Sequence, residues 1–189
     1  MMHKSLSDLN LDDLDQCVPD TLQAHAVTAV LLALGSNYQA KTYLPIARAR
    51  LAELGEVQLS TAFQNPDFTA TVDLPKPDYT NQCVYLSLKT PTTLKQLEQT
   101  LKQLEGVCHR KRSTEKQASN KQMTIKQATI KQVTIDIDVL IIHLHADKNS
   151  LSNNFQSKWI IMQDRYPFKA HEIAGIEELI ENGAFSSIE

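Results

Sequence analysis

The stretch Val27-Thr-Ala-Val-Leu-Leu-Ala-Leu34, followed directly by Gly35-Ser36-Asn37, is the part of the sequence that decides the fold. The run is almost entirely apolar and contains valine, and turn-forming residues close it. Such a run is typical of a strand that lies in the middle of a sheet and is buried on both faces. We therefore expect a central strand over 27–34 that ends in a tight turn at Gly35.

The rest of the chain shows alternating strand and helix periodicities. Apolar residues recur every three or four positions in two expected helices and every second position in the expected strands. Thr92 and Thr93 offer an N-cap for the second helix. The order β-α-β-β-α-β predicts an α+β fold, a ferredoxin-like (split β-α-β) antiparallel sheet with helices packed on one face. The expected segments after the first strand are a helix over 43–54 closed by Gly55, a strand over 57–63, a loop over 64–78, a strand over 79–89, a helix over 94–104, a strand over 133–142, a short strand over 159–162 and a closing helix over 173–180.

The composition predicts a soluble globular protein. Its 189 residues include 19 Lys and Arg against 22 Asp and Glu, so the net charge of −3 offers no general attraction for nucleic acid. No apolar run reaches the roughly 18 residues of a membrane span, and the first residues lack the apolar core of a signal peptide. The three cysteines follow no disulfide or zinc pattern. We expect a cytoplasmic protein, a monomer, that binds neither nucleic acid nor membranes.

Two regions depart from the rest of the chain. Residues 1–26 hold five aspartates against one lysine, which predicts a frayed acidic arm; a short helix docked on the body is the alternative. Residues 121–135 are three copies of the pentad Lys-Gln-x-Thr-Ile, a period that matches no solenoid unit. We therefore divide the chain into an arm over 1–26 and a domain over 27–189, with a long inserted loop at about 113–132.

The triplet Asp136-Ile137-Asp138 is the strongest chemical signal. On a strand, residues i and i+2 point to the same face, about 6.6 Å apart at a rise of about 3.3 Å per residue. Two carboxylates placed there among apolar neighbours repel each other and lose hydration, so they need a cation. Mg²⁺ prefers carboxylate and phosphate oxygens, which predicts a site for phosphoryl transfer. The alternative is a pair that faces solvent.

A basic cluster begins directly after the second expected helix. Seven Lys and Arg residues lie between His109 and Lys131, against the single acid Glu115. Arginines beside a carboxylate and metal site can neutralise charge that grows on a transferred phosphoryl group. The alternative is a solvated basic loop that touches nucleic acid, which the lack of interleaved aromatic residues disfavours.

Four segments together resemble the 6-hydroxymethyl-7,8-dihydropterin pyrophosphokinase (HPPK) family of the folate pathway. They are Leu34-Gly-Ser-Asn37, Pro77-Asp-Tyr-Thr-Asn81, Leu104-Glu-Gly-Val-Cys-His-Arg-Lys-Arg112 and Asp136-Ile-Asp-Val-Leu140. Their order and spacing match the family over residues 27–142. The resemblance implies an ATP-dependent, Mg²⁺-dependent transfer of pyrophosphate from ATP to 6-hydroxymethyl-7,8-dihydropterin.

The resemblance also implies roles for particular residues. Asp136 and Asp138 would hold two Mg²⁺ ions and, with Arg110, form the catalytic group. The ATP phosphates would be bound by Arg110, Arg112 and Arg165, and the pterin by Gly35, Asn65, Tyr79, Asn81 and Phe168.

The sequence departs from the family pattern at several positions. Val133 stands where the family has an arginine three residues before the first aspartate, and His109 stands where it has glycine. The family's Pro-His pair before the late arginine is missing. These departures favour, as an alternative, a divergent paralogue that binds a pterin or nucleotide with weak or no catalysis. A third possibility is a ferredoxin-like module that binds RNA, although the expected strands lack its paired exposed aromatic residues.

Overall fold

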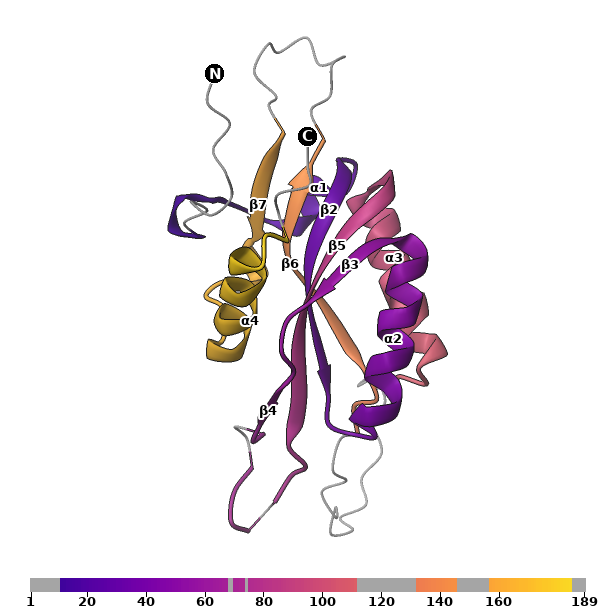
Figure 1. Ribbon diagram of the computed structural model, residues 1–189, viewed down its shortest axis with the longest axis vertical. Coiled ribbons are helices and arrows are strands. Elements are labelled where there is room, and N and C mark those ends of the chain that lie inside the picture. Colours follow the sequence, from indigo (N-terminus) through magenta and orange to yellow (C-terminus); the bar gives the residue numbers. More distant parts are fainter. Residues whose placement is uncertain (1–10, 68–69, 74, 112–131, 146–156, 185–189) are drawn as a thin grey trace, which may run out of the picture.

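The fold is a seven-stranded mixed sheet with helices packed on it (Figure 1). The computed structural model describes residues 11–67, 70–73, 75–111, 132–145 and 157–184. The elements in chain order are η2 (Leu11–Asp13), β1 (Asp15–Cys17), α1 (Pro19–Leu22), β2 (Ala26–Ser36), α2 (Ala40–Leu54), β3 (Gly55–Leu59), β4 (Phe63–Asn65), β5 (Tyr79–Thr93), α3 (Leu94–Val107), β6 (Asp136–Leu144), β7 (Lys158–Met162), η3 (Gln163–Arg165) and α4 (Ala170–Glu181).

The strand order is the one that a ferredoxin-like fold requires. The central four strands lie in the order β6-β2-β5-β3, and each pairs antiparallel with its neighbour. β7 extends this sheet antiparallel to β6, and β4 pairs with the start of β5. β1 then pairs with β7 in parallel, so the sheet is mixed rather than purely antiparallel. The predicted α+β, ferredoxin-like fold is confirmed.

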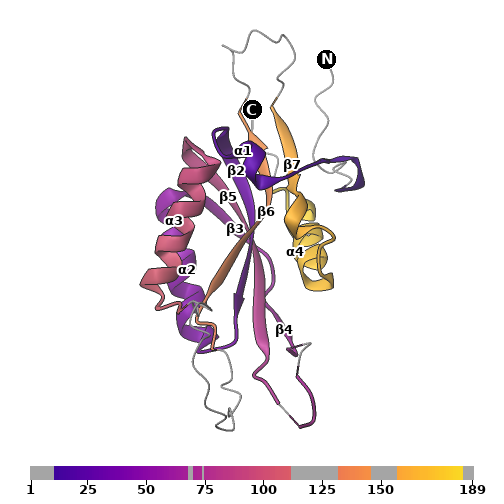
Figure 2. The same cartoon turned by 180° about the vertical axis from the view of Figure 1, so that it is seen from behind.

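Helices cover both faces of the sheet. α2 and α3 lie against one face and α4 lies against the other, as the two opposite views show (Figures 1 and 2). The central strand β2 contributes to the core on both sides, with Val30, Leu32 and Leu34 under α2 and α3 and with Ala29 and Leu31 on the α4 side. The sequence predicted helices on one face only, and this was wrong because the weakly patterned α4 buries the second apolar face.

Glycine at position 55 is required by packing rather than by a helix cap. The sequence placed Gly55 at the end of a helix, and α2 does end there, but its φ of 177° is ordinary extended backbone. A Cβ atom on Gly55 would lie 1.8 Å from the carbonyl oxygen of Ser87. The close approach of β3 to β5 therefore excludes any side chain. The predicted N-cap Thr93 is confirmed, since its side chain forms a capping box with Gln96.

The N-terminal segment packs against the domain. Leu22 of α1 is only 6% exposed and belongs to the main core, while β1 pairs with β7. The frayed conformation that we expected for residues 1–26 is therefore wrong over residues 11–26, and residues 1–10 lie outside the described part. The expected inserted loop also lies outside it, apart from residue 132. Among the described helices, none has the length and apolar character needed to cross a membrane.

Candidate active site

Three neighbouring strands bring the predicted substrate and metal residues together. Gly35 on β2 pairs in register with Asn81 on β5 and with Asp136 on β6. Directly paired residues of antiparallel strands project to the same face, so the Asn81 amide and the Asp136 carboxylate flank a position that has no side chain. A Cβ on Gly35 would lie 3.0 Å from Asn81 Oδ1 and 3.8 Å from Tyr79 Cδ1. Glycine therefore keeps the space between the two side chains open.

The remaining polar residues of the predicted pterin site lie next to Asn81. Asn81 Nδ2 donates to Asn65 Oδ1 over 3.4 Å, and Asn65 on β4 pairs with Tyr79 on β5. Burial raises the pKa of Tyr79, and the negative charges of Asp67 and Asp136 raise it further. Tyr79 thus keeps its proton and lies within electrostatic reach of Asp136. These contacts bring together four of the five residues expected to bind the pterin.

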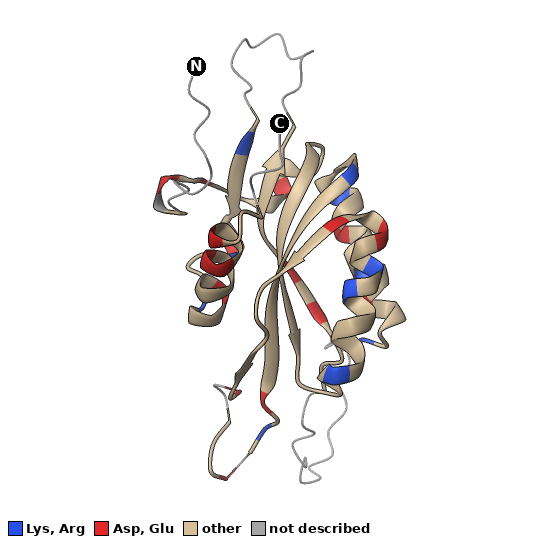
Figure 3. Cartoon of the chain, viewed as in Figure 1, with Lys and Arg blue, Asp and Glu red and all other residues tan. Residues whose placement is uncertain are grey.

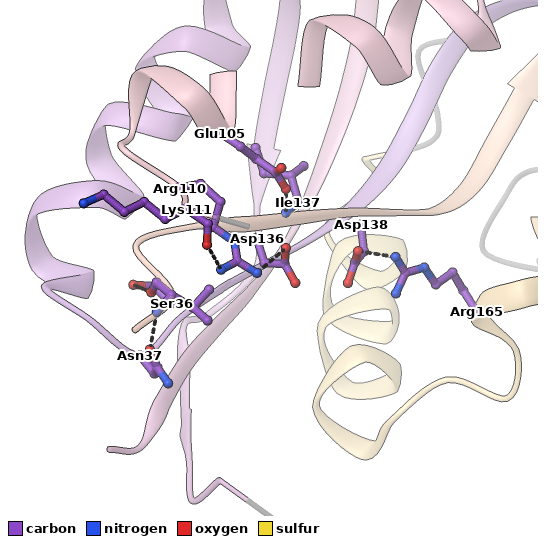
Figure 4. A network of polar contacts seen from close by, with 10 residues as sticks. Ser36, Asn37, Glu105, Arg110, Lys111, Asp136, Ile137, Asp138 and Arg165 are labelled. Atoms are coloured by element: carbon purple, nitrogen blue, oxygen red, sulfur yellow. Dashed lines mark hydrogen bonds and ion pairs between the residues drawn. The ribbon is translucent and has the colours of Figure 1, made fainter. Parts of the chain in front are cut away.

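Asp136 and Asp138 extend from the same face of β6, and each contacts an arginine (Figure 4). Arg110 Nη2 donates to Asp136 Oδ1 over 3.4 Å, and Arg165 Nη2 donates to Asp138 Oδ1. The Arg110 side chain is 6% exposed, and its buried Nε has no hydrogen-bond partner among the described residues. Arg110 therefore has a donor to spare for a further acceptor. Figure 3 shows acidic residues on β6 and basic residues on the helices α2 and α3, which cover one face of the sheet.

Asp138 is the more buried of the two carboxylates. Its side chain is 20% exposed, against 37% for Asp136. Burial raises the pKa of Asp138 to about 6, with Asp136 and Glu172 adding to the rise and Arg165 and Lys169 opposing it. A carboxylate with this environment is stabilised in its ionised form by any additional cation.

Glu105 holds the strand that carries the aspartates in place, a role that was not predicted from the sequence. Its side chain is 2% exposed, and Oε1 accepts a hydrogen bond from the Ile137 amide over 3.0 Å. The Arg110 amide in turn donates to the Glu105 carbonyl over 2.9 Å. One residue at the end of α3 therefore fixes both the strand that carries the aspartates and the start of the segment that carries Arg110. The sequence did contain a signal for this role. Glu105 is a carboxylate that lies beside the buried leucines of an amphipathic helix.

The turn after β2 holds the backbone of Val133, three residues before Asp136, through several hydrogen bonds. The Val133 carbonyl accepts hydrogen bonds from the Asn37 amide (3.0 Å) and from Ser36 Oγ (3.2 Å). The Val133 amide donates to Asn37 Oδ1 over 2.7 Å. The Val133 side chain is 2% exposed. The family's arginine position is thus occupied by a core residue, and the Gly-Ser-Asn segment holds its backbone.

His109 adopts the conformation that explains why the family has glycine there. Its φ is 59°, in the left-handed region that disfavours side chains. The imidazole packs edge-on against Tyr43, with ring centroids 6.4 Å apart. Packing therefore partly compensates for the backbone strain.

Two predicted site residues, Phe168 and Arg112, remain, together with Lys169. Phe168 is 7% exposed, belongs to the core cluster that α4 helps to form, and packs edge-on against Tyr166. Lys169 was not predicted, yet its charge acts on Asp138. Arg112 lies outside the described residues.

The donor set fits Mg²⁺ held jointly with phosphate. Among the described residues, no group of three or more His, Cys, Asp and Glu side chains could hold a metal ion. Mg²⁺ is usually bound by one or two carboxylates together with substrate phosphates and water. Asp136 and Asp138 therefore suit an ion that arrives with a nucleotide better than a permanent structural ion.

Comparison with known proteins agrees with this geometry. No curated protein matches the chain. The family model described as 7,8-dihydro-6-hydroxymethylpterin-pyrophosphokinase (HPPK) matches residues 31–156, about two thirds of the chain. The matched stretch contains Gly35, Asn81, Arg110 and both aspartates of β6. The chain therefore belongs to the HPPK family, the ATP-dependent transferases that pass pyrophosphate to hydroxymethyl-dihydropterin in folate biosynthesis.

Proposed function

We propose that this chain transfers pyrophosphate at the site formed by β2, β5 and β6, with Asp136 and Asp138 holding two Mg²⁺ ions together with the phosphates of ATP. The observation that carries the proposal is the register of Asn81, Gly35 and Asp136 on three adjacent strands. It supports a flat substrate lying over Gly35, with its polar edge at Asn81 and its reactive arm at the carboxylates.

The pterin would be bound by a small set of polar groups. The Asn81 amide can both donate and accept a hydrogen bond at the edge of a heterocycle. Its contact with Asn65 fixes its orientation, and the Tyr79 ring lies beside it. Phe168 would then support these polar residues from the core. Its direct contact with the pterin stays a prediction.

The arginines would orient the phosphates of ATP. Arg110 and Arg165 each already contact one aspartate, so a phosphate bound between them would meet donors that need little rearrangement. Arg guanidinium groups bind phosphate oxygens with two parallel hydrogen bonds, which fixes orientation as well as charge. The predicted contribution of Arg112 lies in residues that the structure leaves undescribed.

The reaction is an in-line displacement at phosphorus. The pterin hydroxyl oxygen forms a bond to the β-phosphorus, the bond from that phosphorus to the oxygen bridging the α-phosphate breaks, and AMP leaves while the hydroxyl proton passes to water. Mg²⁺ bound by the carboxylates and phosphates supplies charge stabilisation for the attacking and leaving oxygens. The side chains named above position the two substrates, which is where most catalysis of phosphoryl transfer originates. Because the reaction uses ATP as its co-substrate, we expect it to take place in the cytoplasm.

The direct test is AMP formation by the purified full chain with ATP, Mg²⁺ and 6-hydroxymethyl-7,8-dihydropterin. We expect Asp138→Asn to lower the rate by at least roughly 10²-fold, because metal charge stabilisation amounts to several kcal/mol. Asp13→Asn, the same change at an exposed aspartate of η2, is the matched control and should retain the full rate. No AMP from the unmodified chain at high enzyme concentration would reject the proposal.

Val133 favours a second candidate, a divergent paralogue that binds a pterin or nucleotide with weak or no catalysis. Loss of an arginine that stabilises transition-state charge costs roughly 10²–10³-fold in rate, and a side chain that is 2% exposed supplies no such charge. Calorimetry separates the two candidates: pterin binding that does not tighten with Mg²⁺ and a non-hydrolysable ATP analogue would support the paralogue, whereas mutual tightening would argue against it.

A further inference from the structure

A cavity of about 170 Å³ adjoins Asp138 on the side of β6 that faces β7. β7 pairs with β6 only over Ile141–Leu144, so in the described part of the chain no strand covers this edge beside Asp138. α3 and the end of β7 form two walls of the cavity. The third wall is Pro19, the first residue of α1.

The cavity is lined by both charged and apolar residues. Asp138 and Arg165, which form an ion pair, are among the charged ones. Leu101 and Met162, which are 3% and 1% exposed, provide an apolar floor together with the half-buried ring of Pro19. Sites that enclose a drug-sized ligand usually measure about 300–1,000 Å³, so this cavity accommodates part of a nucleotide rather than all of it.

The N-terminal segment that carries Pro19 is built into the fold. The Leu94 amide donates to the His25 carbonyl and the Lys95 amide donates to the Gln23 carbonyl, both over 3.1 Å, so the segment satisfies amides at the start of α3. Gln23 Nε2 also donates to Glu98 Oε2 over 3.2 Å, and Glu98 itself lines the cavity. Pro19, Gln23 and His25 all lie before residue 31, where the match to the family begins.

We propose that the N-terminal segment forms a wall of the nucleotide site of this protein, with Pro19 contacting the base of ATP while the phosphates lie at Asp138 and Arg165. The proposal rests on the proposed function, because it takes ATP as the ligand. It makes Pro19 a specificity-determining residue that belongs to this chain's own extension. A flat base with an apolar face suits a floor of leucine, methionine and proline, and the carboxylate of Glu98 can accept a hydrogen bond from an amino group at its edge.

Two ligands that share phosphates and differ in the base provide the test. Dissociation constants of ATP and of inorganic tripolyphosphate, both with Mg²⁺, are measured by calorimetry on the full chain. Pro19→Trp fills the base end of the cavity and should weaken ATP at least roughly tenfold, the lower end of what a misfitting group costs in an apolar pocket. Tripolyphosphate binding should stay within about twofold. Val18→Trp, at a neighbouring residue that is 47% exposed, is the matched control and should change neither constant.

A smaller substitution provides a second test in case the tryptophan variant does not fold. Pro19→Ala removes part of the apolar wall and should weaken ATP about fourfold, which corresponds to the loss of about one buried methylene group. Equal weakening of both ligands, or unchanged ATP binding in both Pro19 variants, overturns the inference. Failure of the unmodified chain to bind either ligand overturns the proposed function instead.

Discussion

Replacing Asp138 by asparagine should stabilise the protein while removing its activity. Burial raises the pKa of Asp138 from its ordinary value of 3.8 to about 6, so at neutral pH the folded chain carries a charge that its environment disfavours. The difference between these two values, at about 1.4 kcal/mol per pKa unit, corresponds to about 3 kcal/mol. That figure is an upper bound because Asn also needs a hydrogen-bond partner in place of the ion pair with Arg165. We expect a gain of about 1–3 kcal/mol in the free energy of unfolding at pH 7.

The gain should depend on pH in a defined direction. Because the pKa of Asp138 is higher in the folded than in the unfolded chain, the protonated group stabilises the fold fully below pH 3.8, and this stabilisation is lost as the pH rises through about 6. The unmodified protein should therefore match Asp138→Asn near pH 4 and fall below it by pH 7.

Urea denaturation without divalent cations measures the effect, with the fluorescence of the single tryptophan, Trp159, as the probe. Asp13→Asn serves as the control for an exposed aspartate and should change the free energy of unfolding by less than about 0.5 kcal/mol. A gain that is the same at pH 4 and pH 7, or a loss of stability at pH 7, would refute desolvation of Asp138 as the cause. Mg²⁺ with ATP at about 100 times its dissociation constant should stabilise only the unmodified protein, by about 2.7 kcal/mol.

Three further substitutions test the surroundings of the aspartates. Glu105→Ala leaves the buried Ile137 amide without its acceptor and should cost about 1–3 kcal/mol in urea denaturation, whereas Glu105→Gln keeps an acceptor oxygen and should cost less; equal losses would contradict this role. His109→Gly should be more stable than His109→Ala by about 1 kcal/mol, since alanine keeps the cost of the left-handed backbone, and the reverse order would show that φ carries no strain. Gly35→Ala should weaken pterin binding at least roughly tenfold in calorimetry while leaving the unfolding midpoint nearly unchanged, because its Cβ would press on Asn81; unchanged binding would exclude the space over Gly35 as the pterin site.

The sequence predicted those parts of the molecule that local patterns determine. The apolar run of β2, the alternation in β5 and the leucine row of α3 each impose one structure, so the central strands, the two larger helices and the Thr93 cap were found. The docking of β1 and α1 could not be found in this way, because it depends on the edge of β7, a short strand far along the chain. The acidic composition of that segment indicated solvation, while the contacts that decide its structure are long-range.

For the candidate site, the sequence indicated the motif residues but not the contacts that hold them in place. The resemblance to the HPPK family pointed to Asn81, Gly35 and Asp136, and the strand register of the structure places these three residues side by side. The role of Glu105 was not, since it depends on one hydrogen bond to a strand 32 positions later. The pairing of Asp138 with Arg165 likewise depends on how η3 follows β7, which no periodicity encodes.

Both ends of the segment that contains the Lys-Gln-x-Thr-Ile copies are anchored to the body of the protein. The Arg110 amide donates to the Glu105 carbonyl before it, and Val133, inside the third copy, forms backbone hydrogen bonds with Ser36 and Asn37. These anchors set the start of β6 independently of the number of intervening pentads, and each doubling of a flexible loop costs only about 0.6 kcal/mol in closure entropy. A change in the number of pentads before Val133 would therefore add little closure entropy, and the carboxylates of β6 would keep their positions.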